Sequence, residues 1–237
     1  MNKTSLQHTA PALIIAIGIV ILGLCIRSGI YHFTDKDRKV VVKGLAEKEV
    51  NADKVTWPIV SKEIGNDLPE LYQRIAVTQA QIKKFLHDGG ISDSEISVNA
   101  PVVIDLNADQ YSDNKRAYRY NVTSIITVTS GQVAQVRALI ARQGELFKQG
   151  IAIVSGDYDN RVRYEFVAFR AMKPKMMQEA IANAEQTAQQ FANSSKSTLG
   201  KIISADQGQF SIDDRDPNTP YIKKVRVVST VTYALND

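Results

Sequence analysis

The sequence contains few side chains at the spacings that metal sites or catalytic centres require. One segment matches the ligand positions of a calcium-binding loop, with Asp105, Asn107, Asp109 and Asp113. An EF-hand loop also needs glycine at its sixth position and glutamate at its twelfth. Gln110 and Arg116 stand at those two positions. We therefore predict a solvated hairpin tip here and no calcium site.

Histidine and cysteine, the usual zinc ligands, are scarce. The histidines are His8, His32 and His87, and no E-x-x-H or H-x-x-x-H pair occurs. Only His87 falls in the expected folded domain, near the end of a predicted helix, where a cation interacts favourably with the helix dipole. The single cysteine, Cys25, lies in an apolar N-terminal run, so the chain can form no internal disulfide. We therefore predict no zinc site.

Other acidic residues and catalytic motifs define no site either. Asp213, Asp214 and Asp216 are close in sequence, but Arg215 interrupts them and prolines follow, which favours an exposed turn. Neither a G-x-S-x-G nucleophile motif nor a G-x-x-x-x-G-K-[ST] phosphate loop occurs. Paired carboxylates meet only in the folded chain, so a hydrolase of that kind stays open as an alternative. We predict no catalytic, cofactor-binding or metal-binding residues, and no cofactor.

The charge composition argues against a nucleic-acid partner. The chain has 29 basic and 25 acidic residues, which gives a formal net charge of +4. The basic residues are dispersed along the sequence, whereas nucleic-acid binding requires a concentrated basic patch with interleaved aromatic residues.

The N-terminal part of the chain predicts a membrane anchor. The run from Ala10 to Ile26 has no charged residue, and its length is at the short end for a membrane-spanning helix and long for the apolar h-region of a signal peptide. No A-x-A cleavage triplet follows, and Leu24 before Cys25 argues against lipid attachment. We predict a tail at 1–9, an uncleaved transmembrane signal anchor at 10–33 and a tether at 34–39, with a cleaved signal peptide as the alternative. Flanking charges slightly favour a cytoplasmic C-terminal domain and leave sidedness open.

Residues 40–237 are expected to form one α+β domain, with helices on one face of a mostly antiparallel sheet. Strand, helix, glycine stop and strand follow one another three times, with the stops at Gly90, Gly150 and Gly200. We expect the first two strands to pair near Asn51–Asp53, and the strands that flank Asn107–Lys115 to form a long hairpin. The predicted strands are Val40–Val42, Lys54–Ile64, Ile96–Leu106, Ala117–Thr129, Ile151–Val154, Arg161–Arg170, Lys201–Ser204 and Lys223–Leu235.

The three predicted helices each show an apolar stripe at helical spacing. The first is capped by Asp67, with the buried stripe Leu71, Ile75, Thr78, Ile82 and Phe85. The second follows Ser130 and has Val133, Val136, Ile140 and Phe147 on one face. The third begins at Pro174, and its stripe is expected to pack on the chain's own sheet through Met177, Ile181, Ala184, Ala188 and Phe191.

The order of several short motifs resembles the SIMPL domain family, which includes bacterial periplasmic immunogenic and oxidative-stress-defence proteins. The resemblance extends over about residues 38–235. It departs at Ala100–Lys115 and Ser211–Tyr221. The motifs are Val40-Val41-Val42-x-Gly44, Asn51-Ala52-Asp53, Gly90-Ile91, Ser97-Val98, Tyr118-x-Tyr120-x-Val122, Gly150-Ile151, Glu179-Ala180 with Ala184 and Ala188, and Leu199-Gly200-Lys201.

The resemblance implies an exported protein, since bacterial members usually carry a signal peptide or anchor and some resemble ring-forming oligomers. It implies no catalytic residues. We therefore expect a single-pass inner-membrane protein whose domain faces the periplasm and which is non-enzymatic. Its expected partners are the membrane, copies of itself or another envelope protein, with a link to stress defence. The interface candidates are the strand with Pro58, which is expected to be an edge strand or to contain a bulge, and the Ala100–Lys115 hairpin.

Two alternatives remain from the sequence alone. One is an envelope hydrolase with a carboxylate site that no short motif reveals. The other is a ligand-binding module with a pocket lined by aromatic rings such as Trp57, Tyr118 and Tyr120. Asn121-Val122-Thr123 matches a glycosylation sequon but lies in a predicted strand.

Overall fold

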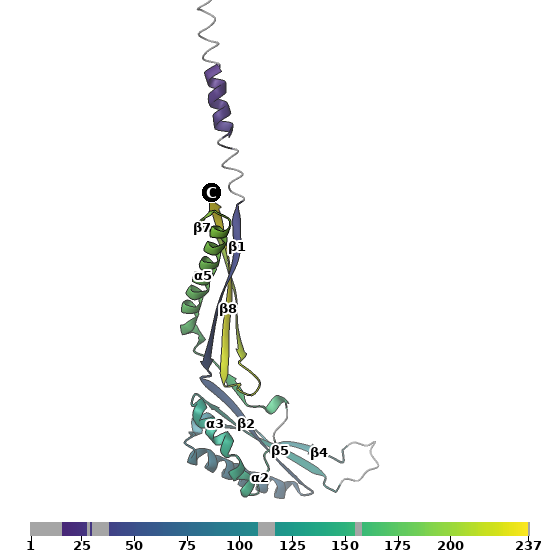
Figure 1. Ribbon diagram of the computed structural model, residues 1–237. Coiled ribbons are helices and arrows are strands. Elements are labelled where there is room, and N and C mark those ends of the chain that lie inside the picture. Colours follow the sequence, from purple (N-terminus) through teal and green to yellow (C-terminus); the bar gives the residue numbers. More distant parts are fainter. Residues whose placement is uncertain (1–15, 28, 30–37, 109–116, 155–157, 237) are drawn as a thin grey trace, which may run out of the picture. The chain divides into compact units, whose positions relative to one another are not determined.

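The computed structural model describes residues 16–27, 29, 38–108, 117–154 and 158–236 (Figure 1). It confirms an α+β fold with antiparallel sheets. The chain divides into two compact units. The first unit comprises the described parts of Met1–Glu47, Pro174–Phe210 and Arg226–Asp237, and the second comprises those of Lys48–Lys173 and Ser211–Val225. Apart from the N-terminal segment of the first unit, both units fall within residues 40–237, which were predicted to form one domain.

The N-terminal anchor expected at 10–33 is only partly described. Residues 16–27 are helical, and 10–15, 28 and 30–33 lie outside the described residues, as do 1–9 and most of the 34–39 tether. In the part of the chain that is described, no helix combines the length and the apolar content of a membrane span.

The first unit contains a three-stranded sheet in the order β1-β8-β7. Its strands are β1 (Lys39–Asn51), β8 (Ile222–Asn236) and β7 (Thr198–Asp214), of which the last residues of β1, the first of β8 and the end of β7 belong to the second unit. Helix α5 (Phe169–Ser194) lies along this sheet (Figure 1). Its alanines pack against Val42, Val231 and Tyr233. The α5 helix therefore covers its own sheet, as predicted.

The buried face of α5 differs from the predicted one. Ala184 and Ala188 are buried as expected, but Met177 and Ile181 are only partly buried and Phe191 is 57% exposed. The buried line runs at steps of four through Met176, Ala180, Ala184, Ala188 and Ala192. The close approach of β1 explains this choice, because a Cβ at Gly44 would lie 1.8 Å from the Ala180 carbonyl oxygen. Only small side chains fit so narrow a gap.

The second unit contains a five-stranded antiparallel sheet. Strand β5 (Tyr120–Ser130) pairs on one side with β2 (Lys54–Gly65) and on the other with β3 (Ile96–Val98) and β4 (Val102–Asp105). Strand β6 (Arg163–Glu165) pairs with the start of β2. The hairpin expected between 96–106 and 117–129 is confirmed by the β4–β5 pairing, and its tip, 109–116, lies outside the described residues.

Helices of the second unit pack on one face of this sheet, as predicted. They are α2 (Leu68–Asp88), α3 (Val133–Arg142) and α4 (Gly144–Lys148). Their buried residues Ile82, Leu139 and Leu146 join Trp57 and Ile126 of the sheet in one core. Leu139 and Leu146, which the predicted stripe omitted, are buried, whereas Phe147 is exposed. The chain turns at Gln143 between α3 and α4, and this break rotates the apolar face.

Three further predictions about the strands were wrong. β1 and β2 do not form a hairpin, because β1 pairs with β8 and β2 pairs with β5 and β6. The segment expected as a strand at 201–204 followed by a polar loop at 206–220 is largely one strand, β7. The strand expected at 161–170 is confined to β6 and gives way to α5 at Phe169.

The strand that contains Pro58 is not an edge strand, because β2 lies between β5 and β6. The Val60 carbonyl accepts a hydrogen bond of 2.8 Å from the Val154 N–H, on the side away from β5. Backbone groups in a strand alternate in direction, so the Pro58 nitrogen points to that same side. Strand β6 pairs only with residues 54–56, and Pro58 therefore removes no hydrogen bond from that pairing.

Candidate functional site

A hollow of about 440 Å³ lies in the second unit, beside the start of α3. We call it the Arg137 hollow. Three segments that are far apart in the sequence line it: the turn after β1, the first residues of α3, and the residue before β8. Its lining residues are Asn51, Ala52, Gly131, Gln132, Val133, Ala134, Gln135, Arg137 and Tyr221.

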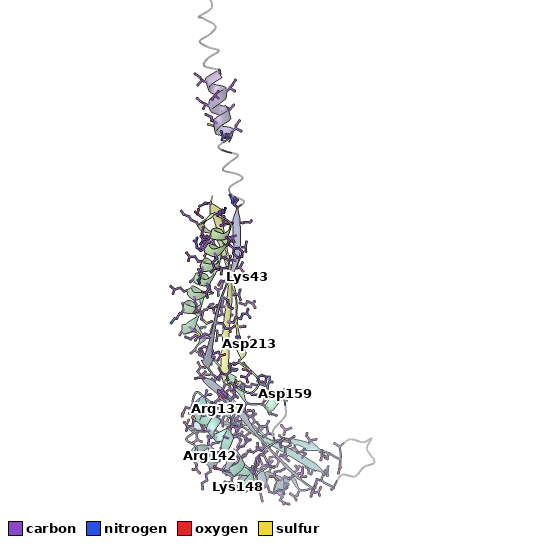
Figure 2. All side chains as sticks on the ribbon, viewed as in Figure 1. Lys43, Arg137, Arg142, Lys148, Asp159 and Asp213 are labelled. Atoms are coloured by element: carbon purple, nitrogen blue, oxygen red, sulfur yellow. The ribbon has the colours of Figure 1, made fainter. Side chains whose placement is uncertain are left out.

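Arg137, which is labelled in Figure 2, lines this hollow. Its guanidinium carbon lies 3.3 Å from the centre of the Tyr221 ring, a cation–π contact. Tyr221 in turn meets Tyr164 edge to face, with ring centres 6.2 Å apart. Burial raises the pKa of Tyr164, and the nearby charge of Arg137 acts in the opposite direction. The arrangement holds a cation against an aromatic face.

The walls of the Arg137 hollow are tied to the rest of the second unit. The Ala52 N–H donates to the Tyr221 carbonyl at 2.8 Å. The Ser130 hydroxyl donates to Glu95 and accepts from the Gln132 N–H. The first bond joins the 51–52 and 221 segments, and the Ser130 bonds hold the start of α3 to Glu95.

A larger hollow of about 750 Å³ is lined by residues 161–165, which include β6, and by the 214–223 segment. Its described acidic groups have cationic partners. Glu165 pairs with Lys54 at 2.9 Å, and Asp214 pairs with Lys223. Asp216, the third acidic residue of this lining, pairs with Arg215 at 3.1 Å, so each acidic side chain that lines this hollow has a cationic partner.

Of the acidic residues in the segment that matches a calcium-binding loop, the structure describes Asp105. The Asp105 carboxylate forms an ion pair of 2.9 Å with Arg119, and this hydrogen bond lowers the pKa of Asp105. Asp109 and Asp113 lie outside the described residues. Among the residues that are described, no three His, Cys, Asp or Glu side chains form a group that could hold a metal ion.

The exposed turn predicted for the 213–216 group is confirmed only in part, because Asp213 and Asp214 are exposed but end strand β7, and the turn begins after them with Arg215 and the partly buried Asp216. Asp216 accepts hydrogen bonds from the Thr219 hydroxyl, from Arg215 and from backbone N–H groups. These bonds, with that of Thr219 the largest effect, lower the pKa of Asp216 to about 2. Asp216 is therefore a structural residue that closes the turn before β8.

His87 also has a structural position. It lies in the last turn of α2, as predicted, and its Nε2 is 3.0 Å from an Asp93 carboxylate oxygen. Both side chains are exposed to solvent. His8 and His32 lie outside the described residues, and Cys25 is exposed on the helix at 16–27.

The aromatic residues proposed to line a pocket do not form one. Trp57 is 3% exposed and packs in the core beneath α2 and α3. Tyr120 packs with Leu71 and Val122, while Tyr118 is exposed. Asn121 lies in β5 between β2 and β4, so the sequon is part of a sheet.

Two strand edges carry exposed apolar side chains. β7 ends the order β1-β8-β7, and its Ile202 and Ile203 are 51% and 54% exposed. β4, on the predicted hairpin, exposes Val102, Val103 and Ile104. An exposed edge presents unpaired backbone groups that can accept another strand.

Sequence reasoning missed Arg137 and Tyr221. No short motif marks either residue, since Arg137 is one of many dispersed basic residues and Tyr221 follows a polar turn. Only the pairing of β1 with β8 brings the 51–52 and 221 segments together at the start of α3.

Comparison with known proteins supports the resemblance seen in the motifs. A search among curated proteins finds no match to the chain. The family model for SIMPL, described as a protein of unknown function (DUF541), matches residues 40–233, which is most of the chain and includes the whole of the second unit. The chain therefore belongs to the SIMPL family.

Proposed function

We propose that this SIMPL protein is a non-enzymatic protein of the cell envelope that assembles with copies of itself, anchored in the inner membrane and facing the periplasm. Assembly would make it a scaffold for envelope components, and the family resemblance favours a link to stress defence. The exposed edge of β7 is the observation that carries this proposal.

Strand β7 has the features of an association surface. It runs over Thr198–Asp214 at the end of its sheet, and side chains from Lys201 to Gln207 are exposed on both faces. Soluble proteins usually protect such an edge with a short strand, a proline or inward-pointing charges. Here the edge is long, and its middle carries the adjacent Ile202 and Ile203.

A second copy of the chain is the partner that fits this edge best. Two identical edge strands can pair antiparallel about a two-fold axis, because each then offers the other the same backbone donors and acceptors. Pairing would also cover the isoleucines of both copies. Burial of apolar area contributes about 25 cal/mol per Å², in addition to the backbone hydrogen bonds.

Substitution of both isoleucines by lysine is expected to weaken assembly. Light scattering on the full-length chain in detergent should give a mass that rises with concentration above the 26.2 kDa of one chain. Ile202→Lys combined with Ile203→Lys should shift the dissociation constant upward by about tenfold or more, because like charges would face each other across the edge.

The matched control is Val77→Lys, at an exposed apolar position on α2 in the second unit. It should leave the concentration dependence unchanged. A wild-type chain that stays monomeric at all concentrations would contradict the assembly proposal, as would equal effects of the two variants.

The anchor makes a separate prediction about location. The uncharged run from Ala10 to Ile26 supports retention of the N-terminus in the membrane. Protease added to spheroplasts should degrade residues 40–237, while protease added to intact cells should not. The mass of the purified chain should include Met1. A shortened chain would indicate cleavage, and protection in spheroplasts would indicate a cytoplasmic domain.

A further inference from the structure

We propose that the Arg137 hollow binds a small carboxylate with a compact apolar body. This site lies in the second unit and is independent of the β7 edge. The hollow contains a cation without an acidic partner in the lining, polar groups beside it, and apolar walls of suitable size.

The Arg137 guanidinium is the group that would bind an anion. The Arg137 guanidinium carbon lies 3.3 Å from the centre of the Tyr221 ring, so this contact engages an aromatic face, and a guanidinium carries its five N–H donors around its edge. The described residues that line the hollow include no aspartate or glutamate. A carboxylate can therefore accept two parallel hydrogen bonds from this edge without competition from the lining.

Further donors stand beside Arg137. The lining includes the first residues of α3, whose N-cap Gln132 forms no capping hydrogen bond with its side chain. Asn51, which has a side-chain amide, also lines the hollow. The Gln135 amide is already engaged, because it donates to the Gly89 carbonyl at 2.6 Å. The N–H groups at the start of α3 and the Asn51 amide add to the electrostatic attraction of the guanidinium for a negative charge.

The rest of the hollow is apolar and small. Ala52, Val133 and Ala134 line it, together with the ring of Tyr221. A volume of about 440 Å³ lies within the range of small-molecule sites. The ligand therefore needs one charged group and a compact apolar remainder.

The charge of the ligand follows from the lining. Arg137 is the one charged residue among the described lining residues, so the site supplies a single positive charge. A phosphate dianion would keep an uncompensated negative charge in a half-enclosed hollow, which is unfavourable. A monovalent carboxylate matches the single guanidinium.

Benzoate is a suitable probe, since it combines a carboxylate with a flat apolar ring. Binding to the full-length chain in uncharged detergent can be followed by calorimetry, with empty micelles subtracted. Benzoate should bind at least about tenfold more tightly than benzamide, because only the carboxylate pairs with a cation. Inorganic phosphate should bind more weakly than benzoate.

Variants locate the binding at Arg137. Arg137→Gln should weaken benzoate binding by about tenfold or more, and Arg137→Lys, which keeps the charge but loses the forked geometry, by a smaller factor. The matched control is Arg142→Gln, on the same helix but paired with Glu145, which should leave benzoate binding unchanged. Circular dichroism checks folding, and if Arg137→Gln is unfolded the Arg137→Lys result decides.

Several results would overturn this proposal. They are undetectable benzoate binding by the wild-type chain, equal binding by the wild-type and folded Arg137 variants, and phosphate or benzamide binding as tight as that of benzoate. None of these outcomes bears on assembly through β7, which is measured by mass.

Discussion

Gly44→Ala is expected to lower the free energy of unfolding by about 3 kcal/mol, which is the upper end for overpacking. The added Cβ would lie 1.8 Å from the Ala180 carbonyl oxygen and 2.6 Å from the Ala184 nitrogen. Both are backbone atoms of α5 and cannot move by a change of rotamer. Relief requires the whole helix to shift, which opens the packing of its alanines against Val42 and Val231.

The sign of this effect is opposite to the usual effect of removing a glycine from a strand. Where the native backbone tolerates alanine, replacement of glycine stabilises a protein by about 0.4–1 kcal/mol through the unfolded chain. Gly44 is in β1 and is not one of the glycines with positive φ, so backbone conformation imposes no penalty. The expected loss of stability in Gly44→Ala therefore comes from steric overlap alone.

Denaturant unfolding followed by far-UV circular dichroism measures this loss. Gly144→Ala is the control, since a Cβ there would meet nothing within 4 Å and would stand at the start of α4. It should be neutral or slightly stabilising. Adding Ala184→Gly to Gly44→Ala should recover little stability, because the nearest atom is the Ala180 backbone oxygen. Equal stability of Gly44→Ala and the wild type would show that α5 does not pack this closely.

Structural features that depend on residues close together in the sequence were predicted correctly. The start of α2 is one, because the Asp67 side chain accepts the Glu70 N–H at 3.0 Å within a single turn. The buried stripe of α2 was also correct, from Leu71 to Phe85. Its periodicity is clear since one face meets a core and the other meets water.

Structural features that depend on contacts between residues far apart in the sequence could not be predicted. The pairing of β1 with β8 joins segments from opposite ends of the folded region, and nothing in β1 specifies it. The sequence did not reveal the full length of β7, because a strand that is exposed on both faces lacks the alternation of apolar and polar residues. The α5 face was assigned by hydrophobicity to Met177, Ile181 and Phe191, whereas the narrow gap at Gly44 selects small side chains.

The candidate site could not be predicted from the sequence for the same reason. The Arg137 hollow needs Asn51, Arg137 and Tyr221 in one place, and each comes from a different part of the chain. The predicted aromatic pocket failed for the converse reason. Trp57 and Tyr120 are on β2 and β5, and their rings point into core regions of the second unit.

Trp57→Ala is expected to lower the free energy of unfolding by about 4 kcal/mol, within the range for removal of a large buried ring. The Trp57 ring is almost fully buried, in the same core as Phe85 of α2 and Leu139 of α3. Loss of the ring would leave a cavity between the sheet and both helices. These elements cannot all close on it, since β2 is held in register with β5 along its whole length.

Denaturant unfolding followed by circular dichroism measures the Trp57→Ala effect, and Tyr118→Ala is the matched control. Tyr118 is 48% exposed, so loss of its ring should change stability by less than about 1 kcal/mol. The wild-type chain adds an independent observation, because Trp57 is its one tryptophan. Its fluorescence should be resistant to quenching by acrylamide and unchanged by benzoate. A readily quenched Trp57, or a small loss in Trp57→Ala, would place this ring at a surface and revive the aromatic pocket that the core packing argues against.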